Sequence, residues 1–319
     1  MTTYAADLTT IRAAAARIAG IAHVTPVATC ATLDRLAGRS LFFKCEHLQK
    51  VGAFKFRGAC NAVRKLTDAV AARGVVTHSS GNHAQALALA AQLRGIPAHI
   101  VMPSNASPVK RRAVEGYGTR VIACEPNLEA RETTAAAVLA ETGGTLIPPY
   151  NHPDVIAGQG TTALELLEQV PGLDAIITPV GGGGLLSGVT LAAKGINPAM
   201  RIFAAEPKGA DDAARSKAAG TLIPQTGPHT IADGLLTSLG DLTWPVLRDL
   251  VERVITVSEE EIVAAMRLAW ERAKLLIEPS AAVAVAVTLS AEFRGLEGMR
   301  RVGVVLSGGN VNLDALPWK

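Results

Sequence analysis

The sequence predicts an α/β protein whose parallel sheets are covered by helices on both faces. Short runs of β-branched and aliphatic residues, such as 75–77 and 175–177, alternate with segments of helical periodicity. These runs lack the strict polar–apolar alternation of a half-exposed strand, which indicates strands buried on both faces. A chain of 319 residues, 49% of them apolar, is long enough to form two such domains.

The expected elements alternate along most of the chain. We expect strands at 75–77, 98–102, 120–122, 175–177, 201–204 and 302–306, and helices at 84–91, 109–115 and 128–139. Strands separated by helices are typical of right-handed crossover connections. The segment 145–153 contains three prolines and no helical period, so we interpret it as a return crossing between two α/β domains.

Composition argues against several classes of function. The net charge of +3 is small and is not concentrated in any block, so neither a nucleic acid nor a membrane surface is an expected partner. The four cysteines are scattered without metal-binding spacing, which is typical of buried thiols in a reduced compartment. The longest nearly apolar stretch, 281–291, is far shorter than the roughly 20 residues that cross a bilayer. With no signal-peptide layout at the N-terminus, we expect a cytoplasmic protein.

Four consecutive glycines, Gly181, Gly182, Gly183 and Gly184, stand between a predicted strand and a predicted helix. Such a loop can fold closely round an anion, and the helix start supplies free N–H groups. The pattern therefore indicates a phosphate site, although glycines also serve tight turns and close packing. The absence of a Walker lysine and of a GxGxxG pattern argues against a nucleoside triphosphate or a dinucleotide.

Two further loops follow predicted strands. The run 79–83, Ser-Ser-Gly-Asn-His, could wrap a carboxylate with hydroxyl and backbone N–H groups, or could simply cap the next helix. In the run 307–310, Ser-Gly-Gly-Asn, the hydroxyl of Ser307 could bond a ligand ring or cap a turn.

Lys55 lies in the segment 52–58 at the expected start of a helix. A lysine in that position is usually a solvated surface charge. The flanking residues Phe54 and Phe56 would instead desolvate the amine and lower its pKa, as a Schiff-base lysine requires.

An acidic segment, 206–212, offers two carboxylates and a backbone carbonyl that would suit a hard divalent cation. The same residues could be ordinary acidic side chains in the first turn of a helix.

Taken together, these motifs resemble one family. Lys44-Cys45-Glu46, the segment 52–59, the run 79–83, Ala157-Gly158-Gln159-Gly160-Thr161, the four glycines and the run 307–310 occur in the order found in fold-type II pyridoxal-phosphate (PLP) enzymes. The resemblance is to the branch of serine racemase, serine/threonine dehydratase and 3-hydroxyaspartate dehydratase, and it covers essentially the whole chain. It implies a tryptophan synthase β-like fold with the cofactor between two domains. We expect 1–72 and 149–319 to form the large cofactor-binding domain and 73–148 the small domain.

The resemblance also implies roles for single residues toward the cofactor. Lys55 would carry the cofactor as a Schiff base and move the Cα proton on one face. The other expected cofactor contacts are Phe54 on the ring, Asn82 at the phenolic oxygen, glycines 181–184 at the phosphate and Ser307 at the pyridine nitrogen.

The remaining implied roles concern substrate, metal and effector. Ser79, Ser80, Asn82 and His83 would hold the substrate carboxylate, and in the racemase the residue matching Ser80 is the acid/base on the opposite face. Glu206, the Ala210 carbonyl and Asp212 would bind Mg²⁺, Mn²⁺ or Ca²⁺. Gln85, Lys110 and Tyr117 match nucleotide contacts of the animal racemase.

Arg131 lies in a stretch, 124–132, that matches the racemase and hydroxyaspartate dehydratase group. The family position lies near the substrate side chain, where Arg131, helped by Ser238 and His83, could hold a second carboxylate. A solvated helix arginine paired with Glu129 or Glu132 is the other interpretation.

These observations predict a PLP-dependent dehydratase, an ammonia-lyase that acts on 3-hydroxyaspartate, serine or threonine and releases ammonia with a keto acid or an imine. The alternative is an amino-acid racemase that uses Lys55 and Ser80 on opposite faces. A non-catalytic PLP-binding protein is disfavoured by the intact Lys55, Ser80 and metal ligands. We also expect a homodimer.

Overall fold

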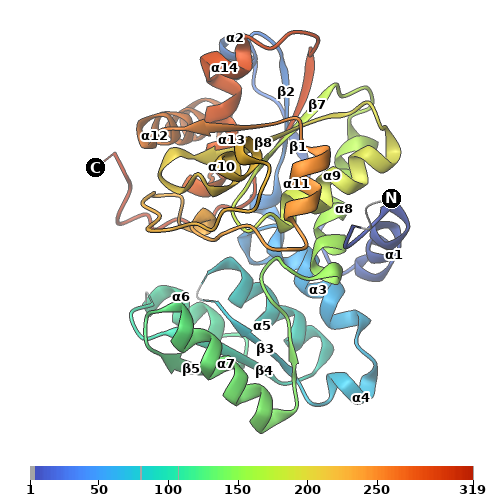
Figure 1. Ribbon diagram of the computed structural model, residues 1–319, viewed down its shortest axis with the longest axis vertical. Coiled ribbons are helices and arrows are strands. Elements are labelled where there is room, and N and C mark those ends of the chain that lie inside the picture. The colour runs from blue at the N-terminus through green and yellow to red at the C-terminus, as the bar shows by residue number, and fades with distance from the viewer. Residues whose placement is uncertain (1–3, 80, 107, 319) are drawn as a thin grey trace.

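Two parallel sheets form the framework of the computed structural model, which describes residues 4–79, 81–106 and 108–318 (Figure 1). Over these residues a six-stranded sheet has the order β1-β2-β10-β7-β8-β9 and a four-stranded sheet has the order β5-β4-β3-β6. Neighbouring strands are parallel except for β1 and β2, which are antiparallel. The predicted fold class of two parallel-sheet α/β domains is therefore confirmed.

The strands have the following bounds. They are β1 (Val27–Ala28), β2 (Ser40–Lys44), β3 (Val75–His78), β4 (Ala98–Pro103), β5 (Arg120–Cys124), β6 (Thr145–Leu146), β7 (Ala175–Pro179), β8 (Arg201–Pro207), β9 (Arg253–Val257) and β10 (Arg301–Val305).

The helices have the following bounds. The α-helices are α1 (Leu8–Ile18), α2 (Ala31–Ala37), α3 (Lys55–Lys65), α4 (Asp68–Ala71), α5 (Asn82–Arg94), α6 (Pro108–Glu115), α7 (Leu128–Thr142), α8 (Pro153–Gln169), α9 (Gly184–Ile196), α10 (Asp212–Ala219), α11 (Trp244–Leu250), α12 (Glu259–Leu268), α13 (Pro279–Leu289) and α14 (Ala291–Arg294). Short 3₁₀ or π turns are η1 (Glu46–Leu48), η2 (Lys50–Gly52), η3 (Lys208–Ala210), η4 (Asp233–Leu235) and η5 (Ala269–Ala273).

Both faces of the larger sheet are buried, as the unbroken apolar strands predict. Ile176 and Ile202 pack into a core with α1, α8, α9 and α11. Their neighbours Ile177 and Phe203 point the other way, into a core with α2, α12 and α13. Residues 281–287 of α13 are all buried, so the longest apolar stretch of the sequence is a core helix. In the described part of the chain, no helix combines the length and apolar character needed to span a membrane.

The smaller sheet follows the same rule. Val75 and Ile100 pack toward α3 and α5, whereas Val76 and Val101 pack toward α7. Helix α3 contacts α5 of the small domain and α8 of the large domain, so it joins the two. Strands β3 to β6 lie within residues 75–146, and we keep the domain boundaries stated above as a proposal.

The sequence prediction omitted four strands. In β1 and β6 only two residues pair, too few to produce an alternating pattern. Strand β6 lies inside the segment that we expected to be a crossing without regular structure, and it pairs with β3. Beyond β6 the chain runs from the small domain to α8 of the large domain (Figure 1).

The four cysteines are buried and unpaired, as expected. Burial raises the pKa of the Cys45 thiol and of the Cys60 thiol to about 11, so neither is a thiolate near neutral pH.

Candidate active site

The predicted site residues lie beyond the carboxyl ends of parallel strands, where ligands bind in open α/β sheets. In the large domain, β7 leads into the glycine run, β8 into the acidic segment and β10 into Ser307. In the small domain, β3 ends at His78, directly before Ser79. Lys55 begins α3, the helix that joins the domains.

The Lys55 side chain is half-buried and its amine faces main-chain and aromatic groups. Nζ donates a hydrogen bond to the Pro149 carbonyl at 2.8 Å and lies 5.0 Å from the centroid of the Phe54 ring. Burial lowers the pKa of Lys55 to about 8, although the Glu278 carboxylate opposes the shift. The amine is therefore prepared to act as a neutral nucleophile or base near physiological pH.

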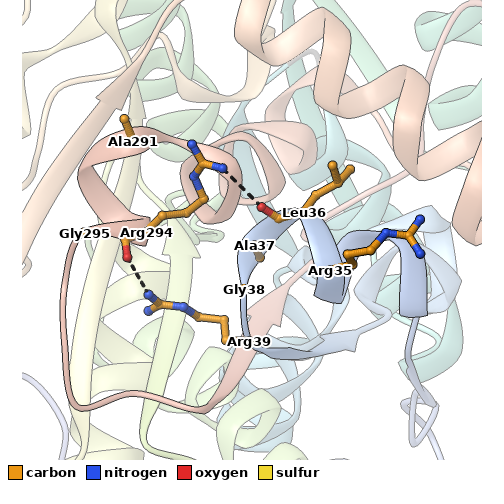
Figure 2. Close-up of a pocket in the computed structure, with 8 residues that line it drawn as sticks. All are labelled: Arg35, Leu36, Ala37, Gly38, Arg39, Ala291, Arg294 and Gly295. Atoms are coloured by element: carbon orange, nitrogen blue, oxygen red, sulfur yellow. Dashed lines mark hydrogen bonds between the residues drawn. The ribbon is translucent and has the colours of Figure 1, made fainter.

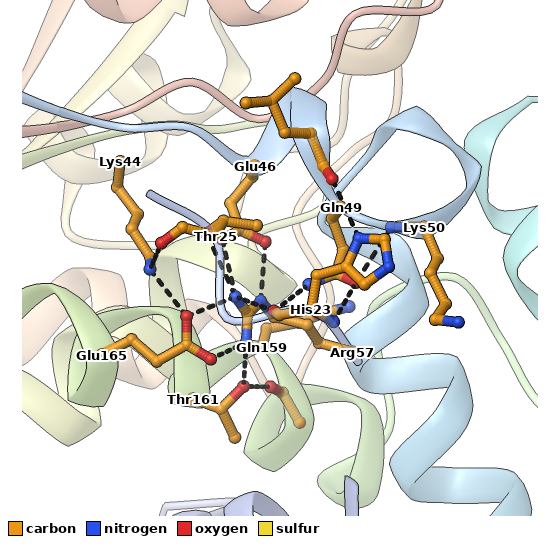
Figure 3. Close-up of polar contacts among 12 residues, drawn as sticks. His23, Thr25, Lys44, Glu46, Gln49, Lys50, Arg57, Gln159, Thr161 and Glu165 are labelled. Carbon is orange, nitrogen blue, oxygen red and sulfur yellow. Dashed lines mark hydrogen bonds and ion pairs between the residues drawn. The ribbon is translucent and has the colours of Figure 1, made fainter. Parts of the chain in front are cut away.

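A buried ion cluster fixes the start of α3 (Figure 3). The fully buried Arg57 side chain, two residues after Lys55, binds the Glu46 carboxylate at 2.7 and 2.9 Å. It also binds both oxygens of Glu165 on α8, at 2.7 and 2.8 Å. Buried Lys44 completes the cluster with a bond of 2.7 Å to Glu165. Two cations and two carboxylates thus tie α3, β2, η1 and α8 together.

The cluster explains a motif that sequence reasoning could only match to a family. Burial alone would lower the pKa of Arg57, but the Glu46 and Glu165 carboxylates raise it overall, so the guanidinium remains charged. Thr161, from the Ala157–Thr161 run, accepts a further bond from Arg57 at 3.2 Å. The segments that carry Lys44–Glu46, Arg57 and Thr161 therefore meet at one point.

The glycine loop presents unpaired N–H groups. All four glycines are buried, and Gly183 has a φ of +84° at the N-cap of α9. The N–H groups of residues 181–186 donate to no acceptor within the described part of the chain. A Cβ on Gly181 would lie 2.9 Å from the Leu235 backbone, and one on Gly182 would enter the Tyr150 ring. Only glycine fits here, and the free donors suit a phosphate.

Asn82 is held by two side chains from the large domain. Its amide nitrogen donates to both oxygens of the Glu278 carboxylate, at 2.9 and 3.2 Å, and its oxygen accepts from the Asn310 amide at 2.8 Å. Asn310 N–H also donates to Glu278 at 3.1 Å. The Asn82 amide is therefore held in one orientation by the two large-domain side chains.

His83 is buried with a fixed tautomer. Its Nε2 lies 2.9 Å from the Ile147 carbonyl oxygen, which can only accept, so Nε2 carries the hydrogen. Burial and the nearby Lys55 lower the pKa of His83 to about 3, so the ring stays neutral and Nδ1 is an acceptor without a partner. A neutral acceptor cannot donate to a carboxylate, so a carboxylate contact of His83 would come from its backbone N–H, and the expected role of His83 stays a prediction.

Ser79 is the described serine of the carboxylate loop. Ser79 N–H donates to Val101 O at 3.1 Å and so extends the β3–β4 ladder by one bond. Ser80, the expected second acid/base, lies outside the described residues.

Ser307 lies beside the start of α3. It is buried, and its carbonyl accepts a hydrogen bond of 3.0 Å from the Phe54 N–H. The neighbouring residue Gly308 pairs with Ala53, which brings the loop after β10 against the chain that leads to Lys55.

Arg131 is half-buried on α7, where Nε donates to the Asn127 carbonyl at 3.3 Å. Among the described residues it forms no ion pair, so the expected alternatives Glu129 and Glu132 do not neutralise it. Burial lowers the pKa of His78, next to the carboxylate loop; the Glu132 carboxylate opposes this shift and the Arg131 guanidinium adds to it, so both charges lie near His78. Ser238 lies on a different segment, and its hydroxyl accepts from the Gln225 N–H at 2.9 Å.

The acidic segment that begins at the end of β8 buries two carboxylates, Glu206 and Asp212. Glu206 accepts from the N–H groups of Ala213 and Ala214 at 2.8 Å each, and Asp212 accepts from Leu239 N–H at 2.9 Å. Burial raises the pKa of Glu206 to about 8 and that of Asp212 to about 6. Asp212 Oδ1 is buried without a partner. This donor set fits a hard divalent cation with waters in the remaining positions.

A surface hollow of about 430 Å³ lies elsewhere, between α2 and α14 (Figure 2). Arg39 and Arg294 extend along it and donate to main-chain carbonyls of Arg294 and Leu36 respectively. None of the predicted site residues lines this hollow.

Sequence reasoning missed Glu278 and Thr243. Glu278 stands directly before Pro279 and an apolar helix, where an acidic residue is commonly only a helix-start preference. Thr243 lies in no recognisable motif, although its hydroxyl bonds the glycine loop.

The residues present fit pyridoxal phosphate. The glycine loop offers unpaired N–H donors for a phosphate, and the Lys55 amine has the lowered pKa that imine chemistry needs. Glu278 and Asn310 orient Asn82, and Ser307 lies beside Phe54. This arrangement, on two parallel-sheet domains, defines a PLP-dependent enzyme.

Comparisons with known proteins agree. The family model described as pyridoxal-phosphate dependent enzyme matches residues 18–308. Serine racemase of Arabidopsis thaliana is 57% identical over 98% of this chain and 96% of its own length. The beta-hydroxyaspartate dehydratase of Paracoccus denitrificans (strain Pd 1222) is 52% identical over 92% of this chain and 93% of its own. The structure of maize serine racemase matches with a TM-score of 0.97, at 54% identity, over 98% of this chain and 95% of that chain. The chain belongs to the fold-type II family of pyridoxal-phosphate-dependent enzymes.

The lowered pKa of Lys55 leads to a testable pH dependence. In cofactor-free protein the amine should be half neutral at about pH 8 and its reactivity should level off above that pH, whereas an ordinary lysine with a pKa near 10.4 keeps gaining reactivity. Competitive acylation followed by peptide mass spectrometry measures this directly, with the surface lysines in the same digest as controls. A Lys55 profile that still rises through pH 10 would contradict the assignment.

Proposed function

We propose that this enzyme is a dehydratase that removes water from a small β-hydroxy amino acid and releases ammonia with a keto acid or an imine. The observation that carries the proposal is the position of the Lys55 amine, whose pKa is lowered. The amine bonds the carbonyl of Pro149, whose neighbour Tyr150 packs on the glycine loop with its free N–H groups, and it lies near Glu278, which binds Asn82. Pyridoxal phosphate, when bound, supplies an electron sink that stabilises negative charge at Cα. Lys55 and Phe54, Asn82, glycines 181–184 and Ser307 are the residues proposed to hold it.

Each residue then has a defined task. The neutral Lys55 amine takes the Cα proton, which its lowered pKa favours near neutral pH. N–H groups and hydroxyls of the loop 79–83 hold the substrate carboxylate. Ser307 presents a neutral hydroxyl where a carboxylate would enforce a protonated ring nitrogen. Negative charge is then less completely withdrawn from Cα, which favours loss of the β-hydroxyl.

Racemisation is the second candidate. The reason to keep it is the 57% identity to serine racemase of Arabidopsis thaliana. Racemisation needs a second acid/base on the opposite face, for which we propose Ser80, whereas elimination does not. Ammonia and keto-acid release from a panel of β-hydroxy amino acids, with enantiomer analysis of the unreacted substrate, separates the two.

We propose 3-hydroxyaspartate as a substrate on the basis of Arg131. A half-buried guanidinium without a carboxylate partner among the described residues, close to the loop after β3, can bind a second substrate carboxylate through two parallel bonds. Support comes from the 52% identity to the Paracoccus dehydratase. Ser238 could assist with its hydroxyl hydrogen, because its oxygen already accepts from Gln225.

The substrate proposal predicts a selective loss. Arg131→Ala should lower kcat/KM for 3-hydroxyaspartate by about tenfold to a hundredfold, since a charge-assisted bond is worth about 1.5–3 kcal/mol. Serine lacks the second carboxylate and should be converted at an unchanged rate. Arg120→Ala, at an exposed arginine paired with Glu141, is the matched control. Equal losses on both substrates would exclude this role for Arg131.

We further propose that Glu206, the Ala210 carbonyl and Asp212 bind a divalent cation. Burial raises the pKa of both carboxyl groups even though the Arg215 guanidinium opposes the shift of Asp212, so a bound cation should stabilise the charged carboxylates and with them the fold. Millimolar MgCl₂ should raise the Tm of the wild type and leave that of Asp212→Asn unchanged. Asp211→Asn removes the same charge from an exposed neighbour and should retain the response. No Mg²⁺ or Ca²⁺ response in the wild type would refute the site.

Assembly and effector binding follow from the family resemblance alone. We propose a cytoplasmic homodimer and a nucleotide site near Gln85, Lys110 and Tyr117. Gln85 lies on α5 and Tyr117 just after α6, and both side chains are half-buried.

A further inference from the structure

Thr243 connects the glycine loop to a neighbouring segment, 239–243. Its side chain is fully buried, and Oγ1 lies 2.8 Å from the Gly182 carbonyl oxygen and 3.1 Å from that of Gly240. Because a carbonyl can only accept and a hydroxyl has one hydrogen, that hydrogen is shared between the two oxygens, with the shorter contact to Gly182, and Oγ1 accepts from Gly240 N–H at 2.9 Å. The Thr243 hydroxyl thus links the loop to a turn that would otherwise only pack against it.

This bond orients the peptide between Gly182 and Gly183. In a trans peptide the C=O and N–H groups point in opposite directions, so a carbonyl bound by Thr243 directs the Gly183 N–H to the other side of the loop. That N–H is among those without an acceptor in the described residues. Packing reinforces the orientation, because a Cβ on Gly183 would lie 2.8 Å from the Thr243 side chain.

The other end of the same segment reaches the acidic site. Leu239 N–H donates to Asp212 Oδ2 at 2.9 Å, while the Leu239 side chain packs against Gly183. Asn151 binds the middle of the segment 239–243. Its side-chain oxygen accepts from Leu242 N–H at 3.1 Å, and its side-chain nitrogen donates to the Asp241 carboxylate at 2.5 Å. The five-residue segment 239–243 therefore connects Asp212, a proposed cation ligand, to the glycine loop, with a hydrogen bond at each end.

We propose that Thr243 is a positioning residue for the cofactor phosphate and that the segment 239–243 couples the cation site to the glycine loop. A cation that orders Asp212 orders Leu239 and, through Thr243, the Gly182–Gly183 peptide. Pyridoxal phosphate and the cation then bind with positive coupling, which is reciprocal by thermodynamic necessity. The inference rests on the proposed cofactor and cation sites. Its new element is the role of Thr243 and of the segment 239–243, which belong to neither set of proposed ligands.

The test is a binding experiment on cofactor-free protein. Pyridoxal phosphate is titrated by fluorescence, once with EDTA and once with MgCl₂. For the wild type we expect a severalfold lower Kd with Mg²⁺. Thr243→Val keeps the shape of the side chain but loses the hydroxyl. Its Kd for pyridoxal phosphate in EDTA should therefore be about tenfold higher than that of the wild type, and Mg²⁺ should no longer change it.

Two variants show whether the hydroxyl is responsible. Thr243→Ser retains the donor and should restore both affinity and coupling. Thr190→Val, at a fully buried threonine of α9 whose hydroxyl has no partner, should behave like the wild type. If Thr243→Val fails to fold, Thr243→Ala replaces it in the same titrations.

Several outcomes would overturn the inference. These are a wild-type Kd that does not respond to Mg²⁺, or a Thr243→Val variant with unchanged affinity and coupling. Calorimetry of Mg²⁺ alone identifies a failure of the cation site. A wild type that binds no pyridoxal phosphate refutes the proposed function itself.

Discussion

The buried pairing of Arg57 with Glu46 and Glu165 is the interaction on which the site depends. With Lys44, which also binds Glu165, its members come from four separate elements, and Arg57 and Glu46 are fully buried, so the charges are balanced only in the folded arrangement. Removing one partner of such a pair commonly costs about 3–5 kcal/mol, because the other charge is left buried and unpaired. Lys55 begins the same helix two residues earlier, so the cluster that secures α3 also determines where the reactive amine lies.

From that fixed helix the site extends into both domains. The Lys55 amine bonds the carbonyl of Pro149, and the next residue, Tyr150, covers the glycine loop. Asn82 of the small domain is bound by Glu278 and Asn310 of the large domain. These hydrogen bonds join residues that are 94 to 228 positions apart in the sequence. The contacts that hold the two domains together are therefore also the contacts that assemble the site. The predicted ligand residues accordingly converge from five strand or helix ends.

Local patterns predicted much of this, and long-range contacts account for what they missed. Apolar runs separated by helices predicted the sheets, and consecutive glycines before α9 predicted the phosphate loop, because both signals lie within a few residues. Glu278 and Thr243 act on residues 196 and 61 positions away, so no local pattern identifies them. The tautomer of His83 is fixed by the Ile147 carbonyl, 64 residues distant. The family resemblance supplied the cofactor, whereas assembly, location and nucleotide binding stay predictions.

The central claim is that this framework delivers Lys55, and no other lysine, to the cofactor. Buried Lys44, only eleven residues away, is the informative competitor, since it is engaged with Glu165 and the Thr25 carbonyl. The most direct measurement is borohydride reduction of the enzyme loaded with pyridoxal phosphate, followed by digestion and peptide mass spectrometry. We predict the phosphopyridoxyl mass on the peptide that contains Lys55, in an amount equal to the bound cofactor. Label on a different lysine, or bound cofactor that no reduction attaches, would contradict the account.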